Sequence, residues 1–230
     1  MSLDPRADLA ELTLAICNIE SVSGNEAKLA DEIEQALTQA SHLAVSRDGN
    51  AVIAKTSLGK SKRVIIAGHI DTVPVSNNLP AVLHHFEREQ VILGRGSVDM
   101  KGGVAVMLKL AIELSSPRYD ITWIFYDNEE VASDLNGLGR ISRNNPEVLA
   151  GDFAVLCEPT SALIEGGCNG TIRIELVARG VKAHSARPWM GSNALHSLTP
   201  ALTTLSAFEP ETVLVDGLEY RESLNAVMVS

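Results

Sequence analysis

The run RVIIAGHID, residues 63–71, joins a nearly unbroken apolar segment to a histidine and an aspartate. A short segment that is apolar at almost every position is typical of a central parallel strand, because such a strand is buried on both faces. Two later runs, ITWIFY at 121–126 and FAVLC at 153–157, have the same character. Helical patterns separate these runs, and the alternation predicts an α/β fold with a mixed, mainly parallel sheet flanked by helices.

The segments around these strands supply the other elements expected before residue 160. Asp4-Pro5 can open a first helix, and Ser23–Glu26 matches a capping box that would start a second helix reaching about residue 40. We also expect strands at 42–45 and 51–54, a peripheral hairpin of 82–86 with 91–93, and a well-buried helix at 100–114.

The pattern of apolar strands and helices changes at the glycine-rich segment 165–170. It predicts two domains, 1–170 and 171–230. In the second domain we expect a strand at 171–178, a helix from about 193 to 208 and a strand at 224–229 in which the chain stops. A domain that ends inside a strand looks unfinished, so we expect a C-terminally truncated protein or a fragment.

Composition narrows the class of protein. Of the 230 residues, 45% are hydrophobic, enough for a real core, and the formal net charge is -10. Because nucleic-acid binding needs clustered Lys and Arg, this charge argues against a nucleic-acid partner. The N-terminus lacks the pattern of a signal peptide, and no apolar run has membrane-spanning length. Three widely spaced cysteines fit a reducing cytoplasm, where we expect the protein to reside.

Polar islands follow the apolar runs. His69-Ile70-Asp71 comes after the first run, Asp127–Glu130 after the second and Glu158 after the third, while Asp99 opens the buried helix. In open α/β sheets, ligands bind beyond the carboxyl ends of the parallel strands. Side chains that can bind a metal are therefore expected to meet there. The patterns of a phosphate-binding loop and of a serine nucleophile elbow are absent from the sequence.

Each island also has a simpler interpretation. Asp71 could accept a ring N–H of a metal-binding His69, or it could cap a turn. Asp99 could bridge two cations, or it could be an ordinary helix N-cap. Glu129 and Glu130 are costly to bury together unless cations offset them. One could bind metal while its neighbour takes a proton from water, or both could be solvated.

Glu158 and His184 also have two interpretations each. Glu158 could be a terminal metal ligand or a loop carboxylate. His184 lies in the second domain between Lys182 and Arg187, so its loop could bind an anionic group, although a lone histidine there is more often structural.

Four motifs, taken together, resemble the co-catalytic zinc amidohydrolases. They are GHIDTVP at 68–74, GRGSVDMKGG at 94–103, NEE at 128–130 and EPT at 158–160. This family includes aminoacylases, glutamate-releasing carboxypeptidases and enzymes that desuccinylate diaminopimelate. The resemblance implies a zinc-peptidase-like catalytic domain in 1–170. It also implies the start of a ferredoxin-like α+β lid and dimerisation domain, incomplete, in 171–230.

The resemblance also implies roles for the matched residues. His69 and Glu158 would bind one zinc ion, Asp99 would bridge both, and Glu130 would bind the second. Co²⁺ or Mn²⁺ would suit similar ligands. The resemblance further implies Glu129 as the general base, Asp71 as the residue that orients His69, and His184 as an oxyanion contact reaching into the partner's active site in a homodimer.

Further segments are similar to the branch of the family that hydrolyses N-succinyl-LL-diaminopimelate to succinate and LL-diaminopimelate, in lysine and cell-wall biosynthesis. They are NLP at 78–80, LNGLG at 135–139, GCNG at 167–170, AHSAR at 183–187 and YRESLN at 220–225. The alternatives are another N-acyl amino acid deacylase, such as an acetylornithine deacetylase, or an inactive fragment. The resemblance covers only the N-terminal part of a family member. We therefore expect the second zinc site to lack its C-terminal histidine ligand.

Overall fold

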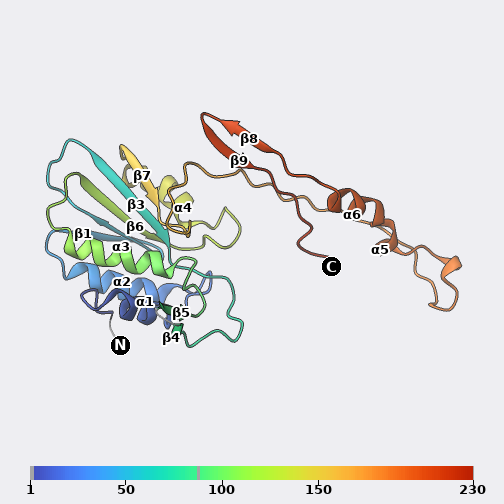
Figure 1. Cartoon of the computed structure of the whole chain (residues 1–230), viewed down its shortest axis with the longest axis horizontal. Helices are drawn as coiled ribbons and strands as arrows, with labels where there is room; N and C mark the ends of the chain where they lie inside the picture. The colour runs from blue at the N-terminus through green and yellow to red at the C-terminus, as the bar shows by residue number, and fades with distance from the viewer. Residues whose placement is uncertain (1–2, 87–88, 230) are drawn as a thin grey trace. The chain divides into compact units, whose positions relative to one another are not determined.

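The computed structural model describes residues 3–86 and 89–229, which form two compact units, Met1–Ala162 and Leu163–Ser230 (Figure 1). In the part of the chain that the structure describes, no helix combines the length and the apolarity needed to cross a membrane.

A five-stranded mixed sheet forms the frame of the first unit. Its strand order is β1 (Ala44–Asp48), β2 (Ala51–Lys55), β6 (Asp120–Tyr126), β3 (Arg63–His69) and β7 (Phe153–Leu156). The strands β6, β3 and β7 are parallel neighbours, whereas β1 and β2 join antiparallel on the other side of β6. The three apolar runs are therefore adjacent parallel strands, and the predicted mixed sheet is confirmed.

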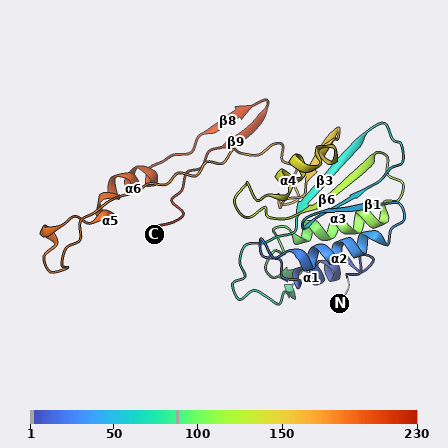
Figure 2. The ribbon, with the colours of Figure 1, turned by 180° about the vertical axis from the view of Figure 1, so that it is seen from behind.

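Helices cover both faces of this sheet (Figures 1 and 2). On one face, α1 (Leu9–Cys17), α2 (Ala27–Thr38) and α3 (Lys101–Glu113) pack with Trp123 and Phe125 of β6. On the other, Ile124 and Tyr126 pack with side chains of α4 (Gly137–Asn144) and the short helix η1 (Pro146–Leu149). Every residue of β6 is buried, and its alternate side chains from Trp123 to Tyr126 enter these two cores, which explains the apolar character of that part of the strand.

The starts of the first two helices differ from the prediction. Helix α1 begins at Leu9 because Asp8, not Asp4, caps it by accepting a hydrogen bond from the Ala10 N–H. Helix α2 begins at Ala27 without a side-chain cap, so the capping-box interpretation of Ser23 is wrong. The Ser23 hydroxyl donates instead to the buried Asp71 carboxylate at 2.7 Å, a charge-assisted hydrogen bond that holds the side chain away from the start of α2.

The expected peripheral hairpin is present, with β4 (Val82–Phe86) pairing antiparallel to β5 (Glu89–Leu93). Helix α3 agrees with the expected buried helix, since Met107, Leu108 and Ala111 enter the core.

The second unit differs more from the sequence analysis. It contains η2 (Pro188–Met190), α5 (Ala194–Ser197), α6 (Thr199–Ser206) and the hairpin β8 (Thr212–Val215) with β9 (Leu218–Arg221). The expected helix is thus divided into two. The strands predicted at 171–178 and 224–229 are wrong: both segments lie outside any strand.

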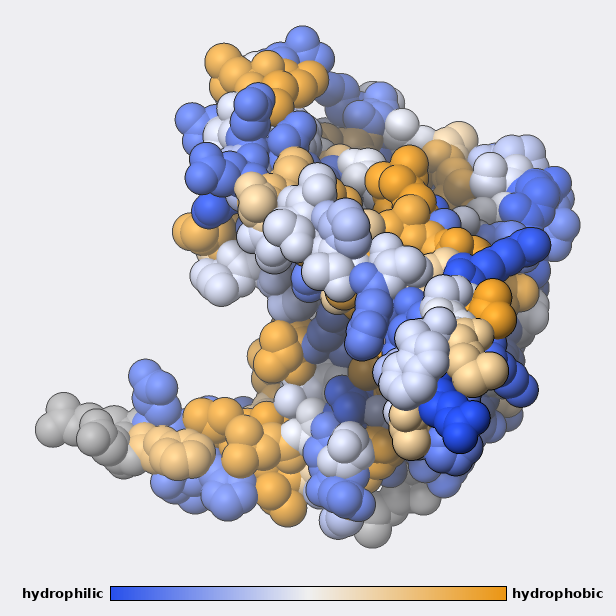
Figure 3. All heavy atoms as spheres, turned by 90° about the vertical axis from the view of Figure 1, so that its right-hand side faces the viewer, coloured by the Kyte–Doolittle hydropathy of each residue, from blue (hydrophilic) through white to orange (hydrophobic). Residues whose placement is uncertain are grey.

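The physical reason is that an alternating apolar pattern favours an extended backbone, whereas a strand also needs a hydrogen-bonded neighbour. Ile172 and Ile174 keep 79% and 67% of their surface exposed, and apolar side chains are visible at the surface in Figure 3. The hairpin was missed although Asp216-Gly217 is a standard turn signal, and both residues have positive φ, 51° and 84°. The interpretation of this unit as a ferredoxin-like lid stays a prediction.

Candidate metal centre

The carboxyl ends of β3, β6 and β7 bring the polar islands together. His69 is the last residue of β3, and its side chain is only 1% exposed. Its Nε2 lies 2.9 Å from an Asp99 carboxylate oxygen and 3.7 Å from one of Glu158. Ligand atoms of His69, Asp99 and Glu130 all lie within 4.8 Å of one another. This cluster has the composition and spacing of a metal site.

Asp99 reaches the cluster from the loop that precedes α3. Met100 occupies the N-cap position of that helix and no side chain caps it, so the interpretation of Asp99 as an ordinary cap is wrong. The loop turns at Gly96, where φ is +77° and a Cβ would lie 2.7 Å from Thr72. A glycine is therefore required for the chain to deliver Asp99 to His69.

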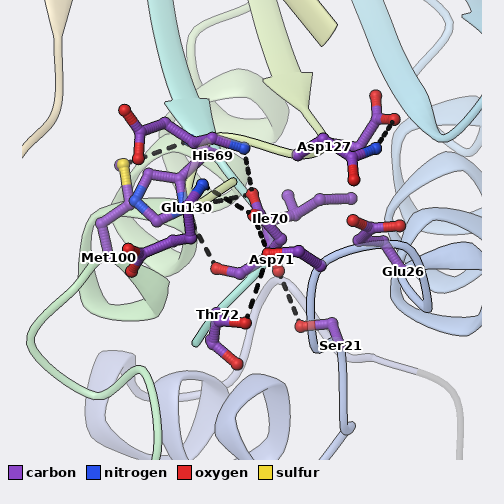
Figure 4. A network of polar contacts seen from close by, with 12 residues as sticks. Ser21, Glu26, His69, Ile70, Asp71, Thr72, Met100, Asp127 and Glu130 are labelled. Atoms are coloured by element: carbon purple, nitrogen blue, oxygen red, sulfur yellow. Dashed lines mark hydrogen bonds and ion pairs between the residues drawn. The ribbon is translucent and has the colours of Figure 1, made fainter. Parts of the chain in front are cut away.

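Asp71 is fully buried between His69 and the turn that follows β6 (Figure 4). The His69 Nδ1 lies 3.0 Å from the Asp71 backbone oxygen and 3.4 Å from its carboxylate. The same carboxylate accepts hydrogen bonds from the Ser23 hydroxyl at 2.7 Å and from the N–H groups of Glu129 and Glu130 at 2.9 and 3.1 Å. Asp71 is thus in contact with His69, but most of its hydrogen bonds go elsewhere.

The charges in the cluster are unbalanced. Burial first, and then the neighbouring Asp99 carboxylate, raise the pKa of Glu130. Burial also raises the pKa of Glu158, helped by the other carboxylates and opposed by His69. Burial alone would lower the pKa of His69, but its hydrogen bonds with Asp71 and Asp99 raise it to about 9. Several carboxylates crowding a single imidazole form a site that a cation would stabilise, so the residues fit a bound metal ion.

His184 is the one predicted site residue in the second unit. It is exposed, its Nδ1 accepts a hydrogen bond from the Ala186 N–H at 3.1 Å, and it lines a surface hollow of about 600 Å³ together with Lys182 and Asn193. Its role in stabilising an oxyanion stays a prediction.

Sequence reasoning missed residues that hold the cluster in place. Ser23 was assigned to a helix cap, and the contact of Asp127 with Arg140 was not foreseen. The Ser23–Asp71 and Asp127–Arg140 contacts have no signal in the sequence. Each joins residues from separate elements and therefore leaves no periodic pattern.

The model of peptidase family M20/M25/M40 matches residues 65–213. The chain belongs to this family. All four motifs, at 68–74, 94–103, 128–130 and 158–160, lie within the matched residues, and so do His69, Asp99 and Glu130 of the candidate metal centre.

Two relatives extend the comparison over nearly the whole chain. This M20-family chain is 50% identical over 229 residues to a Mycobacterium tuberculosis protein provisionally named succinyl-diaminopimelate desuccinylase DapE, covering 99% of the chain and 64% of that protein. It is 46% identical over 230 residues to the succinyl-diaminopimelate desuccinylase of Corynebacterium glutamicum, covering 98% of the chain and 61% of that protein. The chain therefore spans less than two thirds of the length of these relatives.

Solved structures share the M20 fold. Aminopeptidase PepT of Bacillus cereus superposes with a TM-score of 0.54 at 16% identity, covering 95% of this chain and 65% of that one. An M20 metallo-carboxypeptidase of Sulfolobus solfataricus gives a TM-score of 0.54 at 16% identity, covering 65% of this chain and 37% of that one. At this identity the likeness concerns the fold alone.

Proposed function

We propose that the protein is a metal-dependent amidohydrolase that cleaves N-succinyl-LL-diaminopimelate to succinate and LL-diaminopimelate. The observation that carries the reaction class is the convergence of His69, Asp99 and Glu130 within 4.8 Å, with Glu129 adjacent in the chain. The substrate rests on the names of the two relatives, which are 50% and 46% identical to this chain.

We propose that His69 and Glu158 hold one zinc ion, that Asp99 bridges two, and that Glu130 holds the second. One imidazole and three carboxylates suit Zn²⁺, and Co²⁺ or Mn²⁺ would also accept them. The support is the approach of Asp99 and Glu158 to the same His69 nitrogen, at 2.9 and 3.7 Å. A metal ion in such a site acts as a Lewis acid and lowers the pKa of water.

Glu129 is the proposed general base. Its backbone N–H is held by Asp71 at 2.9 Å, which leaves the side chain free to take a proton from the attacking water and to pass it to the leaving amine. Asp71 is the proposed positioning residue for His69. His184 of the partner subunit is the proposed donor to the tetrahedral oxyanion in a homodimer formed through the second unit.

A hydrolysis assay on the zinc-loaded chain tests this function. We expect release of diaminopimelate from N-succinyl-LL-diaminopimelate with a kcat/KM higher than for N-acetylornithine, measured through the free amine that appears. A higher value for the acetylated substrate would replace the desuccinylase by a different N-acyl deacylase. Zinc binding without hydrolysis of any N-acyl amino acid would overturn the proposed activity and retain the metal site.

Metal binding should release a proton from His69. Because the pKa of His69 is raised to about 9 in the metal-free chain, the imidazole is protonated at neutral pH and must lose its proton to bind zinc. We expect the apparent zinc affinity to rise with pH up to about 9. Calorimetry at pH 7.5 in buffers of different ionisation enthalpy measures the released proton, and a buffer-independent enthalpy would contradict His69 as a ligand.

The stability of the metal-free chain should show the opposite trend with pH. The pKa of His69 is higher in the folded chain, about 9, than the value of about 6.5 expected when unfolded. Protonated His69 therefore stabilises the metal-free fold fully below about pH 6.5, and this contribution is lost as the pH rises toward 9. Urea titrations of the metal-free chain at several pH values measure the trend, with His69→Gln as the control that should flatten it.

A further inference from the structure

The side chain of Arg140 is hydrogen-bonded to Asp127, which directly follows β6 and precedes the Glu129–Glu130 turn. Its two terminal nitrogens donate to the two Asp127 carboxylate oxygens at 2.6 and 3.0 Å, a bidentate arrangement. Asp127 is only 3% exposed. From the other side, Arg140 donates to the Asp48 carboxylate and to the Asp48 backbone oxygen, both at 2.7 Å. Arg140 thus joins α4 to both the end of β1 and the end of β6.

The start of helix α4 is shaped around the same aspartate. The Gly137 N–H donates to the Asp127 backbone oxygen at 2.8 Å, and a Cβ on Gly137 would lie 2.6 Å from the Asp127 carboxylate. No side chain fits there. Asn136 caps the helix by accepting from the N–H groups of Leu138 and Gly139. The segment LNGLG, which none of the proposed chemistry uses, therefore brings the first turn of α4 against Asp127.

Asp127 in turn holds the backbone that carries the two glutamates. The Asn128 side chain donates to the Asp127 carboxylate at 2.8 Å, and Asn128 has a positive φ of 58°. A left-handed conformation at a residue other than glycine persists when its surroundings fix it. The next two N–H groups then donate to Asp71. The turn is held between two buried carboxylates, Asp127 before it and Asp71 beside it (Figure 4).

We propose that Arg140, acting through Asp127, is a positioning residue for the Glu129–Glu130 turn. The fork of the guanidinium fixes the Asp127 carboxylate, which fixes Asn128, and the left-handed Asn128 directs Glu130 toward His69 and Asp99. The consequence for the metal centre rests on the proposed function, whereas the effect on the turn does not.

The test compares Arg140→Lys with Asp48→Asn. Lysine keeps the positive charge but cannot form the two-oxygen fork to Asp127. The control acts on the other arm of the same guanidinium, since an asparagine at position 48 keeps an oxygen for the Arg140 Nε and leaves the Asp127 contact intact. Amide hydrogen exchange of the metal-free chain measures the turn, and a Co²⁺ titration with its visible absorption spectrum measures the centre.

In Arg140→Lys we expect faster exchange at Glu129 and Glu130 and Co²⁺ affinity lower by about 10–100-fold, as for the loss of other residues that orient metal ligands. In Asp48→Asn we expect neither change, although the thermal midpoint falls. Equal exchange and equal affinity in both variants would overturn the proposal and leave Arg140 with a purely structural role. If Arg140→Lys does not fold, Asp127→Asn, which keeps the shape of the side chain, is measured in its place.

Failure of the proposed function gives a different result. If the unsubstituted chain binds no Co²⁺, the metal site is wrong, and the exchange of the metal-free chain still decides whether Arg140 holds the turn.

Discussion

The Glu129→Gln variant is expected to hydrolyse its amide substrate about 10²–10⁴ times more slowly than the unsubstituted protein while binding the same amount of zinc. Glutamine keeps the size of the side chain but cannot accept a proton from water. Glu129 lies outside the cluster of His69, Asp99 and Glu130, and its contact with Asp71 is made by the backbone, which the substitution retains. The measurements are kcat with saturating substrate and zinc per chain by elemental analysis.

The matched control for this variant is Asp134→Asn. It removes an exposed carboxylate from the segment that follows the same turn, and we expect both kcat and zinc content to be unchanged. Loss of zinc in Glu129→Gln would make Glu129 a ligand rather than a base. Undiminished hydrolysis would exclude it from the proton transfer.

The second large effect is expected for Asp71→Ala. The substitution leaves the Ser23 hydroxyl and two backbone N–H groups without their shared buried acceptor. It also removes the carboxylate beside the His69 ring, which keeps its contact with the backbone oxygen of residue 71. Breaking a buried charged contact of this kind costs about 3–5 kcal/mol of the free energy of unfolding. Because His69 and Glu130 lose their orientation together, zinc affinity should fall by about 100-fold or more. Urea denaturation of the metal-free chain and a zinc competition titration measure the two losses.

The pH dependence of this stability loss has a definite sign. Burial would raise the pKa of Asp71, but the hydrogen bonds from His69, Ser23 and the two backbone N–H groups lower it below its ordinary value. The stabilisation is therefore present above the unfolded pKa of about 3.9 and is lost as the pH falls through the folded value.

The control for Asp71→Ala is Ser23→Ala, which removes one donor and keeps the acceptor, and it should lower the free energy of unfolding by only about 1 kcal/mol. An equal loss in both variants would show that Asp71 does not hold the turn.

The frame of the site could be predicted because strand burial leaves a direct trace in the sequence. Residues of β3 and β6 are apolar without alternation, since both faces of these strands are covered, and this places the ends of the strands side by side. His69 and the Asp127–Glu130 island were located correctly at those ends. Asp99 could be predicted as a candidate, but only the structure distinguishes it from a helix cap.

The contacts that orient the site could not be predicted in the same way. The pattern Ser-x-x-Glu at 23–26 is compatible with a helix cap, and nothing near it in the sequence reveals the competing carboxylate of Asp71. The pairing of Arg140 with Asp127 and Asp48 likewise depends on how α4 packs against the sheet. In the second unit, apolar alternation at 171–178 was mistaken for a strand because alternation does not say whether a neighbouring strand is available.

The single carboxylate of Asp71 also limits how this site can change by mutation. It receives hydrogen bonds from the segment before α2 and from the turn after β6, so a substitution at Ser23 alters the setting in which one at Glu130 acts. Effects of residues that share a partner do not add, and a double-mutant cycle between these positions should give a coupling energy of about 0.5 kcal/mol or more. A serine outside every metal-binding motif is thereby coupled energetically to the turn that carries the glutamates.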